Sequence, residues 1–357
     1  MSFPGNHKDK LVRATDLDAL SCRLSANKKG YFEPPDEFIP DLLRSYEQAL
    51  QFCDGYTQMS AGRSIRGTFS EPKLPLINRG TYFRTECINR VVNEFIREHG
   101  KCQIVALGGG SDTRSFRVLQ EHANVCYTEI DFPELTKIKK IAISKLQRLQ
   151  TIIRGKLPPI MILSRAEMAQ LDADLHTKNY NLISFDLRKA ETHGQAKFAF
   201  LDKKLPTLVI SECVLCYMTP EENIAVLKFW KSLFESMAVI FYDPMSLNDA
   251  FGETMALNLT KRGLNLQTFT QFPDLHARKQ LFEETLGFEA MLTDLALVGG
   301  YTNEKDSWIL KEELARVLRL EMIDEVEEIR LLLGHYCLIY AESGMKLQFA
   351  ASLNWRM

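Results

Sequence analysis

The chain has 357 residues, of which 45% are hydrophobic and 25% are charged, and its formal net charge is −2. These values are typical of a globular protein with a sizeable core, and they argue against a general binder of nucleic acid or of membrane surfaces. No stretch approaches the ~20 apolar residues of a membrane span, and the N-terminus lacks the apolar segment of a signal peptide. We therefore expect a cytoplasmic protein.

Cysteine usage agrees with that compartment. The eight cysteines are scattered without the spacing of a disulfide framework, which predicts reduced thiols. Cys213 and Cys216 form a C-x-x-C within the apolar run "ISECVLCYM". A redox pair is possible there, but the apolar surroundings favour buried thiols.

The first eighty residues read as an arm in front of a sheet. Residues 1–10 are predicted to be a flexible tail, and a helix-capping signature stands at Thr15 or Asp16. Residues 36–53 read as a helix, whereas the basic, turn-rich segment 60–80 is predicted to be a loop or lid. The arm has no evident sheet role, so we expect it to contact substrate.

Helical patterns then alternate with short apolar runs. Apolar residues before Gly100 fall on one face of a helix, which this glycine ends. Five later runs are continuously apolar, as in parallel strands buried on both faces. They are 103–107, 125–130, 180–185, 207–212 and 238–242. This alternation predicts a doubly wound α/β sheet.

The last third of the chain adds elements to that sheet. Residues 251–267 read as a helix between strands, and 304–330 as an acidic helical stretch. Two further apolar runs, 287–295 and 335–343, are predicted to form an added edge pair.

Three glycines follow the first predicted strand. Gly108, Gly109 and Gly110 allow the backbone to approach a ligand closely. Asp131 ends the next strand and lies 23 residues beyond Gly108, near the spacing at which an acidic residue holds a ribose diol. Ligands of open α/β sheets bind at the carboxyl ends of the strands, where Asp186 and Glu212 also lie.

The ligand of this turn is open among three alternatives. The dinucleotide pattern G-x-G-x-x-G is incomplete, because Thr113 occupies the third glycine position, and Asp112 places negative charge where a pyrophosphate would bind. S-adenosylmethionine has a ribose and a cation but no phosphate, so a methyltransferase is favoured over a dehydrogenase. A turn that only packs a helix onto a strand is the third alternative.

Six segments together resemble the leucine carboxyl methyltransferases. They are "LINRGTYFRT", "VALGGGSDTR", "YTEIDFPEL", "SFDLR", "LPTLVISECVLCYMTPEEN" and "RLLLGHYCLIYA". The resemblance is strongest over 75–342 and reaches residue 15 through "TDLDALSCRLSANKKGY". It implies the α/β, doubly wound, seven-stranded S-adenosylmethionine-dependent methyltransferase fold with an added helical N-terminal region. We accordingly divide the chain into an arm and lid, 1–80, and a methyltransferase domain, 81–357.

The resemblance also implies an activity and a partner. The family esterifies the C-terminal leucine carboxylate of the protein phosphatase 2A catalytic subunit and releases S-adenosylhomocysteine. This methylation regulates the assembly of the phosphatase holoenzyme. We expect a monomer that contacts the phosphatase tail and its active-site face. No catalytic base and no metal are expected, because a carboxylate is already a nucleophile at neutral pH.

Roles at the cofactor follow from the same resemblance. Arg84 of "YFRT" is expected at the methionine carboxylate of the cofactor and Glu212 of "SEC" near its amino group. Gly108 would pass close to the cofactor and Asp131 would bind its ribose. From the residues alone, Arg84 could equally be solvated, whereas a buried Glu212 needs a partner.

The remaining site residues are expected at the adenine and at the substrate. Asp186 and Leu187 of "SFDLR" correspond to the adenine contacts, although Asp186 could instead cap the following helix. Arg23 stands where relatives carry lysine, and it would orient the substrate carboxylate. Tyr217 is either a core residue or a substrate contact.

Three rival functions are weighed against this one. The related methyltransferase of tRNA wybutosine synthesis carries a large propeller extension, and a chain that ends at Met357 is not expected to contain one. A small-molecule carboxyl O-methyltransferase would methylate small acids without a phosphatase. A non-catalytic cofactor-binding module is disfavoured by the presence of Arg84, Asp131 and Glu212 together.

Overall fold

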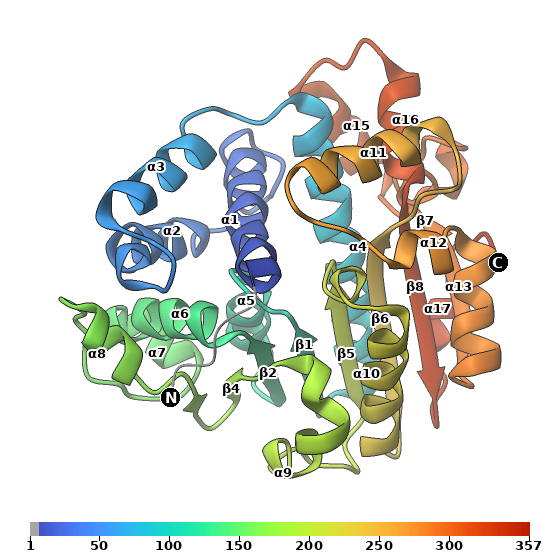
Figure 1. Ribbon diagram of the computed structural model, residues 1–357. Helices are drawn as coiled ribbons and strands as arrows, with labels where there is room; N and C mark the ends of the chain where they lie inside the picture. Colours follow the sequence, from blue (N-terminus) through green and yellow to red (C-terminus); the bar gives the residue numbers. More distant parts are fainter. Residues whose placement is uncertain (1–6) are drawn as a thin grey trace. The chain divides into compact units, whose positions relative to one another are not determined.

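The computed structural model describes residues 7–357, which form two compact units (Figure 1). Unit 1 comprises the chain up to Asn78 together with Gly108–Phe185, and unit 2 comprises Arg79–Leu107 and Asp186–Met357. The predicted tail lies outside the described residues up to position 6. Residues 7–10 are helical, so the tail prediction is wrong for them.

Three helices begin unit 1. They are α1 (His7–Lys28), α2 (Ile39–Ala49) and α3 (Gln58–Phe69), and α1 packs against the other two. The cap expected at Thr15 or Asp16 is wrong, because both residues lie inside α1, where the Thr15 hydroxyl donates to the carbonyl of Val12 at 2.6 Å. The helix expected over 36–53 is confirmed by α2.

The loop or lid expected over 60–80 is also wrong. Helix α3 covers its first half and begins with a capping box, in which the Ser60 amide donates to the Thr57 hydroxyl at 3.1 Å and the Thr57 amide donates to the Ser60 hydroxyl at 2.8 Å. Helix α4 (Pro75–His99) then starts at a proline, a residue suited to a first helical turn. The glycines of this segment indicated turns, but the capping box of α3 and the proline at the start of α4 favour helix on both sides of a short connection.

Unit 1 also contains a parallel strand pair. Strands β2 (Val125–Asp131) and β4 (Tyr180–Ser184) are parallel, and the two-residue strand β3 (Leu175–His176) runs antiparallel to β4. Helix α6 packs against both β2 and β4, and α2 packs against α6. The helices around these strands are α5 (Arg114–Glu121), α6 (Pro133–Lys145), α7 (Gln147–Ile152) and α8 (Arg165–Gln170).

Unit 2 contains a mixed five-stranded arrangement in the order β1-β5-β6-β8-β7. Strands β1, β5 and β6 are parallel, whereas β8 is antiparallel to both β6 and β7, which confirms the predicted edge pair. The bounds are β1 Cys102–Leu107, β5 Thr207–Glu212, β6 Met237–Pro244, β7 Glu289–Asp294 and β8 Tyr336–Ser343. The described residues thus have one strand more than the seven expected, because β3 is too short to leave a sequence pattern.

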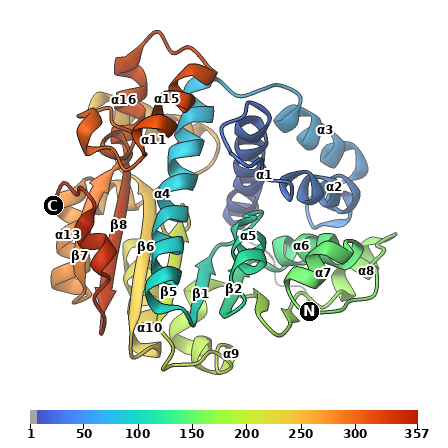
Figure 2. The ribbon, with the colours of Figure 1, turned by 180° about the vertical axis from the view of Figure 1, so that it is seen from behind.

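Two long helices cover opposite faces of β5 and β6 in unit 2. Helix α10 (Pro220–Leu233) lies in front of these strands in Figure 1, and α4 lies in front of them in the reversed view of Figure 2. The apolar face of α4 is buried, and Gly100 ends the helix with a φ of 67°. This double covering explains why the strands read as continuous apolar runs, and it confirms a doubly wound α/β fold with an added helical N-terminal region.

The helices of the last third differ in part from expectation. Helix α11 (Ala250–Lys261) confirms the helix predicted there. The acidic stretch 304–330 is interrupted, however, and yields α15 (Lys311–Leu320) and the start of α16 (Val326–Gly334). The shorter helices are α9 (Gln195–Lys197), α12 (Thr268–Gln271), α13 (Leu275–Gln280), α14 (Leu295–Val298) and α17 (Gln348–Ser352). Over residues 7–357, no helix has both the length and the apolar character needed to cross a membrane.

Candidate active site

The glycine turn in unit 1 requires glycine for two different reasons. Gly108 has a φ of 62° and Gly110 a φ of 39°, a region that residues with a Cβ seldom adopt. A Cβ on Gly110 would also collide with Oδ1 of Asp16 and lie 3.6 Å from Oδ2 of Asp131. The close approach that the sequence predicted is therefore made at Gly110 by two carboxylates of the protein.

Asp131 receives two backbone hydrogen bonds at the end of β2. The Gly110 amide donates to its Oδ2 at 2.7 Å, and the Phe132 amide donates to its Oδ1 at 2.7 Å. Burial, together with the nearby Asp16 carboxylate, raises the pKa of Asp131 to about 7. Each carboxylate oxygen can accept a further hydrogen bond, so the residue fits the predicted ribose diol.

Asp16 of helix α1 accepts hydrogen bonds from the same turn, and the sequence did not predict it as a site residue. The Ser111 amide donates to Oδ1 of Asp16 at 2.7 Å, and the Ser111 hydroxyl donates to Oδ2 at 2.6 Å. The Tyr46 hydroxyl, from α2, also donates to Oδ2. No local pattern signals this contact, because Asp16 and Ser111 are far apart in the chain.

A second contact of α1 involves Arg23, two helical turns beyond Asp16. Arg23 forms an ion pair with Asp112, which also pairs with Arg114. Burial alone would raise the pKa of Asp112, but Arg114 and Arg23 hold it well below its usual range. Arg23 is thus a buried partner of the glycine turn, and its expected contact with substrate stays a prediction.

The other acid of the "EID" motif, Glu129, points into the core. Its Oε2 lies 2.6 Å from Nζ of Lys139 and accepts a hydrogen bond from the Tyr180 hydroxyl at 2.6 Å. Both charged side chains are almost wholly buried, at 1% and 2% exposed. Two acids of one strand therefore have different partners. The Asp131 oxygens accept hydrogen bonds from the Gly110 and Phe132 amides, whereas Glu129 pairs with Lys139 and its side chain lies against Gly109.

In unit 2, Arg84 of α4 is paired with Glu212 at the end of β5. Arg84 Nε donates to Oε1 of Glu212 at 2.6 Å, and the guanidinium lies 5.1 Å from the centre of the Tyr242 ring. The two side chains are 27% and 11% exposed, so the buried acid has the partner it needs. A guanidinium has five N–H groups and a carboxylate about four acceptor sites, which leaves capacity for an amino acid zwitterion at the pair.

The C-x-x-C segment follows directly. Cys213 has a φ of 54°, and burial raises the pKa of its thiol to about 12. Cys216 is wholly buried, and burial also raises its pKa well above the usual value. None of the eight cysteines forms a disulfide. The prediction of buried thiols is confirmed for Cys216, whereas Cys213 is only half-buried.

Asp186 has the alternative role considered from the sequence. It caps the short 3₁₀ turn Leu187–Lys189, accepting from the Arg188 amide at 3.1 Å and from the Arg188 guanidinium at 2.8 and 2.9 Å. Leu187 is buried. The adenine contacts of both residues stay predictions. To bind adenine, Asp186 would have to give up its hydrogen bonds to the Arg188 guanidinium or accept from both groups at once.

Tyr217 lies half-buried against an apolar cluster in unit 2. The buried members of this cluster are Cys216, Leu266 and Phe269. Side chains from α11, among them Met255 and Leu259, pack against the same cluster. The tyrosine is therefore neither a full core residue nor an isolated surface residue, and its substrate contact stays a prediction.

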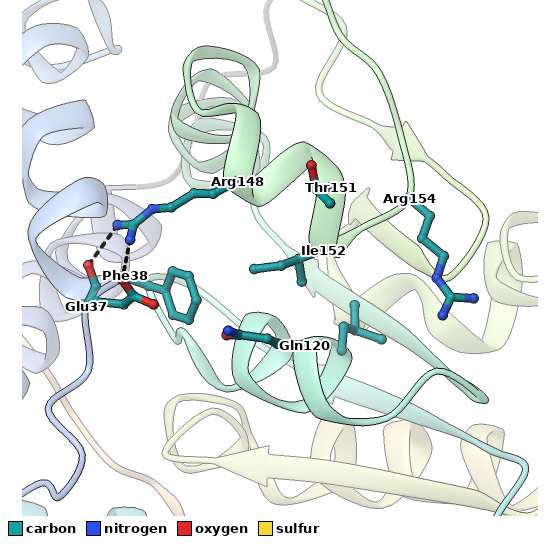
Figure 3. A pocket seen from close by; sticks show the side chains of 8 residues that line it. Glu37, Phe38, Gln120, Arg148, Thr151, Ile152 and Arg154 are labelled. Atoms are coloured by element: carbon teal, nitrogen blue, oxygen red, sulfur yellow. Dashed lines mark hydrogen bonds and ion pairs between the residues drawn. The ribbon is translucent and has the colours of Figure 1, made fainter.

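Unit 1 also contains a pocket of about 470 Å³, which is not lined by Asp131 or the glycine turn (Figure 3). Phe38, Ile152 and Arg154 are among its lining residues, and none of its eight lining residues is a predicted site residue. Its other arginine, Arg148, is already paired with Glu37 and Asp41. Within residues 7–357, no group of three or more histidine, cysteine or acidic side chains is arranged to hold a metal ion.

Comparison with known proteins decides the family. Residues 12–231 match the family model described as leucine carboxyl methyltransferase, and leucine carboxyl methyltransferase 1 of Debaryomyces hansenii is 52% identical over 100% of this chain and 99% of its own. The chain belongs to the leucine carboxyl methyltransferase family. The family member of Candida albicans is 49% identical over 96% of this chain and 95% of its own. A putative methyltransferase structure from Thermobifida fusca is a looser likeness, with a TM-score of 0.47 and 13% identity over 86% of this chain and 98% of that one.

Membership of the leucine carboxyl methyltransferase family confirms the resemblance drawn from the motifs. It also identifies the doubly wound sheet with its helical N-terminal region as a methyltransferase fold. The open choice among a dinucleotide enzyme, a methyltransferase and a packing turn is thereby decided in favour of a methyltransferase.

Proposed function

We propose that this protein transfers a methyl group from S-adenosylmethionine to the α-carboxylate of the C-terminal leucine of the protein phosphatase 2A catalytic subunit. The products are a methyl ester and S-adenosylhomocysteine. The observation that carries the proposal is the 52% identity, over the whole chain, to a leucine carboxyl methyltransferase 1.

The side chains suit the cofactor in charge and hydrogen-bonding capacity. Arg84 would bind the carboxylate of its methionine part, and Glu212 would bind the ammonium group. Asp131 would accept hydrogen bonds from the ribose diol, for which its two oxygens keep acceptor capacity. Gly108 would pass beside the cofactor, and Asp186 and Leu187 would contact the adenine. The opposite charges of Arg84 and Glu212 match the opposite charges of an amino acid.

The protein has little proton chemistry to perform. When bound, the cofactor supplies an activated methyl group on a sulfonium. The pKa of a leucine α-carboxyl is about 3.5, so at neutral pH the group is already an anion and needs no base. What the protein contributes is alignment of the two reactants and exclusion of water. Tyr217 and the apolar cluster beside it have the character needed to contact a leucine side chain.

Esterification would change the charge of the phosphatase tail. It removes one negative charge at the end of the chain, and charge-changing modifications of this kind alter the choice of binding partner. This is the physical basis on which methylation would regulate holoenzyme assembly.

Transfer of labelled methyl to the purified phosphatase catalytic subunit tests the proposal. We expect transfer to the intact subunit and none to a subunit that lacks the terminal leucine. Small carboxylic acids serve as alternative acceptors in the same assay. Transfer to small acids but not to the phosphatase would replace the proposal with a small-molecule carboxyl O-methyltransferase.

A further inference from the structure

Two consecutive amides of the glycine turn donate to two different carboxylates. The Gly110 amide donates to Asp131 on β2 at 2.7 Å, and the Ser111 amide donates to Asp16 on α1 at 2.7 Å. The carboxylates face each other across Gly110, where a Cβ would meet both. One of them is the predicted ribose ligand, whereas the other comes from the helical N-terminal region.

Asp16 is held in place by more than this one bond. Its Oδ2 accepts hydrogen bonds from the hydroxyls of Ser111 and Tyr46, and these two hydroxyls lie 3.1 Å apart. Burial first, and then the Asp16 charge, raise the pKa of Tyr46 well above its usual value, so this hydroxyl stays a donor. The side chain is therefore fixed against the turn by donors from the turn and from α2.

We propose that Asp16 is a positioning residue for cofactor binding, which fixes the glycine turn from α1 and places a second carboxylate opposite the ribose-binding Asp131. This inference rests on the proposed function, because it takes the cofactor to be S-adenosylmethionine. It adds a role for the N-terminal helix that the motifs alone did not indicate.

The second carboxylate has a measurable electrostatic consequence. Like charges at short range disfavour ionisation, and Asp16 is the largest contributor after burial to the raised pKa of Asp131, about 7. The other groups facing Asp131 are Lys139 of α6, which opposes the rise, the donating amides of Gly110 and Phe132, and Tyr46, which stays neutral. Ribose hydroxyls donate to the ionised form of Asp131, so cofactor affinity should increase as pH rises through this value.

The test is the pH dependence of S-adenosylhomocysteine binding, measured by titration calorimetry on the full chain. For the wild type, the ionised fraction of a group with a pKa near 7 rises about tenfold between about pH 6 and about pH 8, and affinity should rise in proportion. Asp16→Asn keeps an oxygen for the Ser111 amide but removes the charge. It should bind several-fold more weakly at about pH 8, because the turn is less firmly held. Its affinity should change less with pH than that of the wild type, because burial alone then raises the pKa of Asp131.

Two variants separate this role from a general loss of structure. Ser111→Ala removes the hydroxyl that bonds to Asp16 and to Tyr46 but leaves the Asp16 charge, so the wild-type pH slope should remain. Glu37→Gln removes a carboxylate of unit 1 that pairs with Arg148, and it should match the wild type at every pH. Asp16→Ser replaces Asp16→Asn if the latter does not fold.

The outcomes are distinct. A flattened slope in Asp16→Asn, with unchanged slopes in both other variants, supports the inference. A parallel shift with the wild-type slope would reduce Asp16 to a structural role and overturn it, as would a wild type whose affinity does not depend on pH. If the wild type does not bind S-adenosylhomocysteine at any pH, the proposed function itself is overturned.

Discussion

Arg84 and Glu212 form an ion pair in which Nε and Oε1 are 2.6 Å apart, and this pair joins helix α4 to the end of strand β5. Such a charge-assisted hydrogen bond is stronger than one between neutral groups. The strand end is also where ligands of open α/β sheets bind. The pair therefore serves both the fold of unit 2 and the proposed cofactor contact.

Removal of the charge on Glu212 should weaken cofactor binding. Glu212→Gln loses a charge-assisted hydrogen bond, so the binding free energy of S-adenosylhomocysteine should fall by about 1.5–3 kcal/mol in titration calorimetry. Glu94→Gln is the matched control, because it also removes the carboxylate partner of an arginine of α4, here the exposed Arg97. Equal losses in the two variants would contradict the assignment of Glu212.

Asp131→Ala should weaken cofactor binding while the protein remains folded, because the residue ends a strand and is not part of the apolar core. Loss of its hydrogen bonds to the ribose should cost about 1.5–3 kcal/mol of binding free energy. Calorimetry with S-adenosylhomocysteine measures the loss, and a melting curve checks the fold. A well-folded variant with wild-type affinity would remove Asp131 from the ribose.

Asp112→Asn should destabilise the protein. The side chains of Arg23 and Arg114 are 11% and 3% exposed, and both would lose the ion pair that they form with Asp112. Breaking a buried pair in this way costs about 3–5 kcal/mol of unfolding free energy, which urea denaturation at neutral pH would measure.

The pH dependence of this effect follows from the pKa of Asp112, which is depressed in the folded protein. Its contribution to stability is present above the ordinary value of 3.8 and is lost as pH falls below that value. The wild type should therefore approach Asp112→Asn in stability under acid conditions. A difference between them that grows on acidification would contradict the ion-pair account.

The rate of methyl transfer should not need a catalytic base. With cofactor and phosphatase both saturating, kcat should be nearly flat from about pH 6 to about pH 8, because the substrate carboxylate is ionised throughout. The kcat/KM for the cofactor should instead fall on the acidic side, as Asp131 becomes protonated near pH 7. A chelator should change neither value. An acidic limb in kcat that one histidine or glutamate substitution abolishes would show that a base exists.

The strands and the strand-end acids were predictable from the sequence because their signals are local. Strands buried on both faces read as continuous apolar runs, and Asp131, Asp186 and Glu212 each stand at the end of such a run. Gly108 has a positive φ of 62°, which the tight turn after β1 requires and which glycine adopts most readily. These features depend on residues that are neighbours in the chain.

The missed features depend on tertiary contact or on short signals. Asp16 meets Ser111 only because α1 folds back onto the glycine turn, so a helix that read as a substrate arm also holds this turn in place. The capping box of α3 uses serine in place of the usual glutamate or glutamine, and it was read as a loop. Arg23 looked available to substrate because its partner, Asp112, is distant in sequence.

Methylation of the phosphatase tail can be read by mass spectrometry of the C-terminal peptide of its catalytic subunit, after incubation with this protein and S-adenosylmethionine. We expect one added methyl group on the terminal leucine α-carboxylate, removable by mild base as an ester, and a much smaller methylated fraction when the protein carries Asp131→Ala at limiting cofactor. A methyl group on another residue, or an unmodified tail under conditions in which the wild-type protein binds cofactor, would contradict the proposed function.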